Sequence, residues 1–129
     1  PYHIDSKIDH EIDKLIVNLG ACVLTEEAVS RISSKEATSV INQWTYHARL
    51  YAAANYVAKH KHMNLIQLVS FGCGLDAVTT DEVKDILERN NKIYTQIKID
   101  EINPLNIMRC KIFFFINVYY SINQCILSC

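Results

Sequence analysis

Short apolar runs alternate with longer amphipathic segments along most of this chain, and this order limits the folds open to it. Residues 21–24 and 65–71 have the length and apolar content of buried strands. Residues 93–99 alternate apolar and polar side chains, which is the period of a strand with one wetter face. Strands separated by helices require right-handed crossovers and hence a parallel sheet. We expect an α/β fold, a three-layer sandwich of Rossmann-like or flavodoxin-like half type, with at least three strands flanked by helices.

Three helices are expected before the second of these strands. Apolar residues recur at helical spacing over residues 8–19, and Gly20 favours the end of that helix. Thr25-Glu26-Glu27 offers an N-cap followed by two acids, which favours a helix directly after the first strand. Residues 37–60 contain neither glycine nor proline, and their alanines indicate close packing against a sheet.

A fourth helix is expected between the last two strands. Thr79 and Glu82 have the spacing of a capping box, which predicts that the helix begins there. Val83, Ile86 and Leu87 then form an apolar stripe at helical spacing. The sequence therefore predicts a helix from about residue 79 to residue 90.

Size and charge suit one modest domain. Half of the 129 residues are hydrophobic, and 13 basic residues stand against 14 acidic ones without a basic stripe, so we expect no nucleic-acid partner. The five cysteines include no Cys-x-x-Cys pair, which favours a reducing cytoplasm over a disulfide framework. The first residues lack the pattern of a secretory signal, and we expect the chain to be a fragment of a longer protein.

The composition changes after residue 102, so we divide the chain into an α/β domain at 1–102 and an atypical apolar tail at 103–129. Arg109 and Lys111 are the only charged residues of the tail. It is too short and too interrupted by polar residues to predict a membrane span. One interpretation is an extra strand near Phe113–Tyr120. The other is a non-native continuation read out of frame, which sequencing the coding DNA would decide.

The segment Gly72-Cys73-Gly74 is the strongest candidate for chemistry. It places a thiol between two glycines where a strand gives way to a helix. Glycines let the backbone approach a bound group, and a helix N-terminus favours a thiolate or an anionic cluster. The alternative is a tight turn that contains a small apolar residue, and one thiol by itself is weak evidence for a metal.

Other candidates share the edge of the sheet where the strands end. Parallel strands bring their carboxyl ends to one rim, and ligands tend to bind there. Glu26, Asp76 and Asp100 follow the three expected strands. His3 and Asp5 would join the same rim if a strand preceded Pro1, whereas a capped turn before the first helix explains them equally well.

The remaining cysteines are not assigned to a site. Cys22 lies within a short apolar strand, and free cysteine there is more often a small core residue than a ligand. The spacings of Cys110, Cys125 and Cys129 match no zinc or cluster pattern.

Several other patterns predict structure rather than chemistry. His60 and His62 are two residues apart, so on a helix they point to different faces and are expected to be solvated helix-end cations. Tyr51 and Tyr56 are expected to contribute to core packing of the long helix. No dinucleotide fingerprint, phosphate loop or serine-nucleophile motif is present, so no motif here binds ATP.

Four stretches together resemble a known family. The chain is similar in order and spacing to the 2-hydroxyacyl-CoA dehydratase-like region of CoA-substrate-specific enzyme activases and their double-cubane-cluster relatives, over about residues 1–102. The resemblance rests on residues 1–5, 23–26, 44–57, and 68–76 together with 98–101.

This resemblance implies an oxygen-sensitive system of anaerobic bacteria, in which ATP hydrolysis drives a low-potential electron toward a CoA thioester. It implies that Cys73, between Gly72 and Gly74, is one ligand of a [4Fe–4S] cluster in the full-length protein. The other ligands and the nucleotide-binding module lie outside this chain, so we expect this chain to carry no cofactor. The expected partners are the remainder of its own protein and a dehydratase or electron-transfer protein, with no membrane.

Two other readings stay open. A flavodoxin-like regulatory or interaction domain would use the rim acids Glu26, Glu27, Asp76 and Asp100 for binding or phosphorylation. A thiol-redox module based on Cys73 is less favoured, because no resolving cysteine lies near it in sequence.

Overall fold

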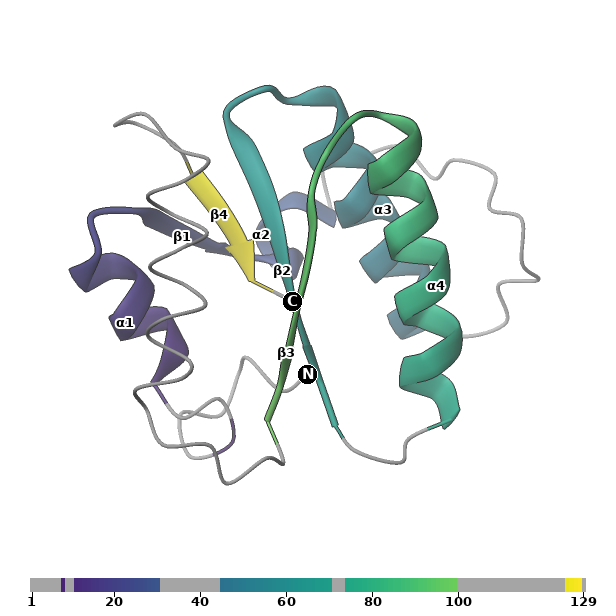
Figure 1. Cartoon of the computed structure of the whole chain (residues 1–129), viewed down its shortest axis with the longest axis horizontal. Helices are drawn as coiled ribbons and strands as arrows, with labels where there is room; N and C mark the ends of the chain where they lie inside the picture. The colour runs from purple at the N-terminus through teal and green to yellow at the C-terminus, as the bar shows by residue number, and fades with distance from the viewer. Residues whose placement is uncertain (1–7, 9–10, 31–44, 71–73, 100–124, 129) are drawn as a thin grey trace.

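A computed structural model describes residues 8, 11–30, 45–70, 74–99 and 125–128 of the chain (Figure 1). Its four strands are all parallel and are ordered β1-β4-β2-β3 in one sheet. The strands are β1 (Cys22–Thr25), β2 (Met63–Val69), β3 (Tyr94–Lys98) and β4 (Cys125–Ser128). The helices are α1 (Ile12–Asn18), α2 (Glu26–Ser30), α3 (Thr45–Lys59) and α4 (Gly74–Arg89). The expected small α/β fold with a parallel sheet between helices is therefore confirmed.

The sheet lies between two helical layers. Figure 1 shows α1 on one side of the strands and α3 and α4 on the other. Alternate residues of β2 serve the two layers: Leu65 packs with the core formed by α2, α3 and α4, whereas Ile66 and Leu68 pack with α1. Every residue of β2 except Asn64 is buried. A strand covered on both faces favours a nearly continuous apolar sequence, and residues 65–69 could be recognised as a strand because only Gln67 among them is polar.

Helix α3 supplies most of the larger core. Leu50, Ala53, Ala54 and Val57 recur at helical spacing and are fully buried. The small alanine side chains let α3 lie close to β2 and α4, and the absence of glycine and proline keeps the helix unbroken. The expected packing role of Tyr51 and Tyr56 is confirmed, because Tyr51 belongs to this core and Tyr56 packs against it.

One buried polar side chain interrupts β2. Gln67 is buried, and its side-chain oxygen accepts a hydrogen bond from the hydroxyl of Tyr94 on β3 at 3.0 Å. A buried amide without a partner would cost about 1–3 kcal/mol, so this bond removes a large penalty. It also joins the two strands through side chains in addition to the ladder that pairs Leu65 with Tyr94 and Gln67 with Gln96.

The strand β4 comes from the apolar tail and enters the middle of the sheet. Cys125–Ser128 pairs with β1 on one side and with β2 on the other. The stretch Phe113–Tyr120, for which a strand was considered, lies outside the described residues. Within the described part of the chain, the tail therefore supplies an internal strand of the sheet and not an edge strand.

Lys92 connects the loops at the amino edge of the sheet. Its Nζ donates hydrogen bonds to the backbone oxygens of His60, Lys61 and Met63, at 2.6, 3.1 and 2.9 Å. Burial lowers the pKa of this lysine from its ordinary value. One side chain thereby fixes the turn between α3 and β2 against the turn that precedes β3.

Two expectations about the elements were wrong. Helix α4 begins at Gly74 rather than near Thr79, so Thr79 and Glu82 lie inside the helix and form no capping box. The hydroxyl of Thr79 instead donates to the backbone oxygen of Asp76 at 3.0 Å, one turn earlier in the same helix. Cys22 was expected in the core but is exposed, because it is the first residue of an edge strand.

The end of the first helix was anticipated. Helix α1 ends at Asn18, and Gly20 follows with a φ of +89°, a left-handed conformation that favours glycine. No helix of the described residues is both long and apolar enough to span a membrane.

Candidate functional site

The carboxyl ends of the strands gather the polar groups of the described chain that were expected to act together. Helix α2 begins with Glu26, directly after Thr25 ends β1. Helices α3 and α4 both run back from this rim, because α3 leads into the start of β2 and α4 follows its end. Arg49 near the start of α3 and Asp76 near the start of α4 therefore lie at the same edge as Glu26. We call this edge the carboxyl rim.

An ion pair joins two elements of the carboxyl rim. Arg49 donates from Nη2 to Oε1 of Glu26 at 2.8 Å, and from Nη1 to Oε1 of Glu27 at 3.4 Å. The Glu26 side chain is only 1% exposed, whereas those of Arg49 and Glu27 are 37% and 45% exposed. Burying a carboxylate is costly unless a cation and hydrogen bonds compensate it. Arg49 supplies that compensation and fastens α2 to α3.

A second contact closes the junction between β2 and α4. Oδ2 of Asp76 accepts a hydrogen bond at 2.9 Å from the backbone N–H of Ser70, the residue after β2. Asp76 is buried and lies in the first turn of α4, where a negative charge interacts favourably with the helix dipole. The bond therefore ties the residue after β2 to the first turn of α4, and we call it the Asp76 clamp.

The structure describes three of the candidate residues. It brings Glu26 and Asp76 to the carboxyl rim, as expected, and it places Gly74 at the first position of α4. Gly74 is exposed, and an added Cβ would meet no atom within 4 Å. The other candidates lie outside the described residues: His3, Asp5, Gly72, Cys73 and Asp100.

Two histidines lie near the amino edge, just after the end of α3. Both His60 and His62 are exposed and follow the end of α3 at Lys59, close to the expected helix-end position. The ring of His60 stacks on Tyr56 with centroids 4.1 Å apart, and its Nδ1 is 2.7 Å from the backbone oxygen of Tyr56. Among the described residues, no group of three or more His, Cys, Asp and Glu side chains is arranged to hold a metal ion.

Sequence reasoning missed the roles of Arg49 and Lys92. Arg49 lies 22 and 23 residues beyond its two acidic partners, and Lys92 lies 29 or more residues beyond the carbonyls it binds. Neither separation along the sequence matches the period of a helix or a strand, so no sequence pattern indicates these contacts.

The comparisons with known proteins identify no relative. No protein-family model, curated protein or solved structure matches this chain.

Proposed function

We propose that residues 1–102 form the α/β unit of an iron–sulfur protein of the CoA-substrate-specific activase and 2-hydroxyacyl-CoA dehydratase type. In this proposal Cys73 supplies one ligand of a [4Fe–4S] cluster that takes part in ATP-driven, low-potential electron transfer in the cytoplasm. The nucleotide-binding module and the other cluster ligands belong to the rest of that protein. A dehydratase or another electron-transfer protein is the electron partner.

The Asp76 clamp is the observation that carries this proposal. It holds Ser70 at the end of β2 and the first turn of α4 at a fixed separation. In the sequence, Cys73 lies between Ser70 and Asp76, the two residues that the clamp joins. Sites built on helices and strands are more precise than sites on loops, and the clamp ties the residue after β2 to the first turn of α4.

The surroundings of Gly74 suit an anionic group. Helix α4 has 16 residues, and its first N–H groups lie at the carboxyl rim, where they favour negative charge. No atom of the described residues lies within 4 Å of a Cβ added at Gly74, which would suit the approach of a bulky group to the backbone. When bound, a cluster would supply one-electron transfer, and the nearby Asp76 carboxylate would favour a low reduction potential by adding negative charge.

One thiolate is too few for a stable cluster, because cubane clusters normally take four cysteines. Cys22 and Met63 are both partners of Cys125 in β4, so they lie at the same position along the strand direction. The carboxyl rim lies at the other end of β2, beyond Val69. Six residues of β2 separate these positions by about 20 Å at 3.3 Å per residue. Cys22 therefore lies too far from the carboxyl rim to supply a ligand there, and we expect this chain alone to bind iron weakly.

Anaerobic reconstitution with iron and sulfide tests the assignment of Cys73. We expect the chain to take up substoichiometric iron that a chelator removes, with weak visible absorbance of the iron–sulfur type. Cys73→Ser should abolish this uptake, and Cys22→Ser should leave it unchanged. Equal uptake by the Cys73→Ser variant, or a stable stoichiometric cluster in this chain alone, would contradict the proposal.

The regulatory alternative receives less support from the rim acids. A phosphorylatable or ligand-binding acid needs an accessible carboxylate, whereas Glu26 is buried against Arg49. Asp76 is also buried and accepts the Ser70 N–H. Both acids therefore have contacts that hold the fold together, and of the described rim acids only Glu27 is substantially exposed.

A further inference from the structure

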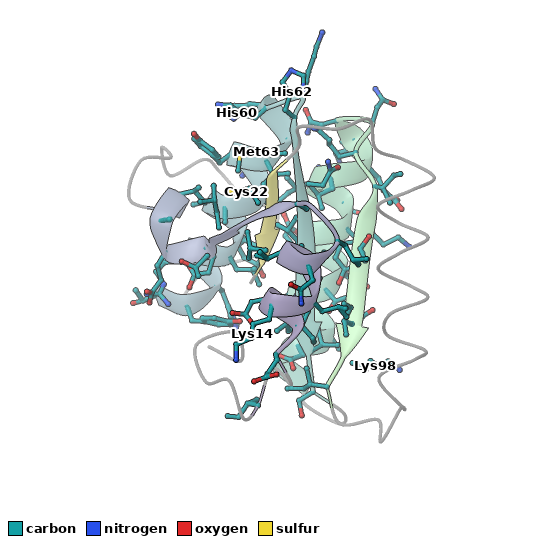
Figure 2. The ribbon with its side chains drawn as sticks, turned by 90° about the vertical axis from the view of Figure 1, so that its left-hand side faces the viewer. Lys14, Cys22, His60, His62, Met63 and Lys98 are labelled. Atoms are coloured by element: carbon teal, nitrogen blue, oxygen red, sulfur yellow. The ribbon has the colours of Figure 1, made fainter. Side chains whose placement is uncertain are left out.

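The sheet register places two cysteines beside each other at the amino edge, far from the carboxyl rim. Cys22, the first residue of β1, is the Cα partner of Cys125, the first residue of β4. Cys125 is also the partner of Met63, the first residue of β2. In Figure 2, Cys22 and Met63 are labelled toward the same end of the molecule as His60 and His62, with Lys98 toward the other end.

This pairing meets the backbone requirement of a disulfide. Adjacent strands lie about 4.8 Å apart, and partners in register occupy the same face of the sheet. Disulfides join Cα atoms that are about 4.4–6.8 Å apart. Leu24, two residues after Cys22, packs with the α3 core, so Cys22 is placed on the α3 face of β1. A disulfide also needs Cβ atoms about 3.5–4.5 Å apart, so the first residues of β1 and β4 have to move slightly closer together when the bond forms.

Cys22 is also accessible to a reagent. Its side chain is exposed, and β1 is an edge strand of the sheet. A thiol in that position can undergo exchange with a small disulfide while the fold stays intact, because exchange rates depend on access. The partner thiol that resolves such a mixed disulfide has to lie within a strand spacing, and Cys125 occupies that register position.

We propose that Cys22 and Cys125 form a reversible, redox-sensitive crosslink through exchange with a low-molecular-weight disulfide. The Cys22 thiolate attacks one sulfur of the small disulfide, forming a mixed disulfide and releasing one small thiolate. The Cys125 thiolate then attacks the Cys22 sulfur, forming the Cys22–Cys125 bond and releasing the second small thiolate. The two cysteines lose two electrons, which reduce the small disulfide to two thiols, and each cysteine proton passes to water or to a released thiolate.

The crosslink would fasten the edge strand β1 to β4 and close most of the chain into one loop. Closing a long loop restricts the unfolded chain more than the folded one, so oxidation should raise the melting temperature. In a reducing cytoplasm both thiols stay reduced, and the bond forms when the thiol–disulfide balance becomes more oxidising. This role is independent of the cluster proposed for Cys73, since it uses the opposite edge of the sheet.

Treatment of the intact chain with oxidised glutathione tests the inference. Mass spectrometry should show a product that has lost the mass of two hydrogen atoms and carries no glutathione on Cys22. Peptide mapping should recover Cys22 linked to Cys125. Cys22→Ser and Cys125→Ser should each prevent this link, whereas Cys110→Ser and Cys129→Ser should retain it. Oxidation should raise the melting temperature of the wild type and of the two control variants only.

Two results would overturn the inference. One is a native, folded chain in which Cys22 keeps a stable mixed disulfide with glutathione. The other is a crosslink that joins Cys22 to a different cysteine or that forms equally in Cys125→Ser. Circular dichroism of each reduced variant establishes that the chain is folded before the oxidant is added, and Cys125→Ala provides a second substitution should the serine disturb β4.

Discussion

Removing either partner of the Glu26–Arg49 ion pair should have unequal effects on stability. Arg49→Met removes the cation from beside a carboxylate that is 1% exposed. Losing one partner of a buried ion pair costs about 3–5 kcal/mol, and the partial exposure of Arg49 places this change near 3 kcal/mol. Glu26→Gln keeps a hydrogen-bond acceptor and leaves a cation that is already partly solvated, so we expect a cost of about 1 kcal/mol.

Urea unfolding followed by circular dichroism measures this asymmetry. With an m value of about 1.5 kcal/mol per molar, Arg49→Met should lower the midpoint by about 2 M and Glu26→Gln by less than about 1 M. Glu27→Gln is the matched control, because the Glu27 side chain is 45% exposed and lies 3.4 Å from Arg49. Its expected cost is below about 0.5 kcal/mol.

The double variant provides a further check on the reasoning. Glu26→Gln combined with Arg49→Met removes both charges, so it should be more stable than Arg49→Met alone. A larger loss for Glu26→Gln than for Arg49→Met would refute the argument that burial of Glu26 sets the cost. So would an effect of Glu27→Gln as large as that of Arg49→Met.

Three further predictions concern the clamp, the amino edge and the core. Asp76→Ala should lower the free energy of unfolding by about 1 kcal/mol and speed hydrogen exchange at the Ser70 amide. Asp76→Asn keeps a hydrogen-bond acceptor and should lower it less. Equal exchange rates at Ser70 in the two variants would argue against the clamp. Lys92→Met should cost about 2 kcal/mol in urea unfolding through three lost hydrogen bonds, and a cost below about 0.5 kcal/mol would show that they contribute little. Burial, then the charge of Glu82, raises the pKa of Tyr51 above its ordinary value. The unfolded chain loses the Tyr51 proton near pH 10, whereas the folded chain keeps it to higher pH. The stability of the fold therefore falls as pH rises from about 10 through the pKa of Tyr51 in the folded chain. Wild type should lose more stability than Tyr51→Phe between about pH 9 and pH 11, and parallel losses would contradict this.

The strands β1, β2 and β3 could be located from sequence because each depends on a local pattern. Residues 65–69 are apolar apart from Gln67 because β2 is covered on both faces, and the alternation over residues 93–99 reflects the wetter β3. The start of α4 was misplaced because Thr79 and Glu82 have the spacing of a capping box at an internal position. A capping box forms only where the backbone enters the helical conformation, and helix α4 already begins at Gly74.

Contacts between distant residues could not be inferred in this way. The exposure of Cys22 depends on β1 being an edge strand, which the run Ala21–Leu24 does not reveal. The position of β4 between β1 and β2 depends on a crossover from the far end of the chain. The carboxyl rim was expected to gather Glu26 and Asp76, yet the contacts that occupy them involve Arg49 and the Ser70 backbone.

The sequence by itself determined the alternation of strands and helices, the parallel sheet between helical layers and the presence of acids after the strands. These follow from periodicity and from the burial that each residue type favours, which act over a few neighbouring residues. Only the tertiary structure decided the strand order, the Glu26–Arg49 pair, the Asp76 clamp and the register that sets Cys22 beside Cys125. Such pairings join segments that are far apart along the chain, and packing selects them without leaving a local pattern.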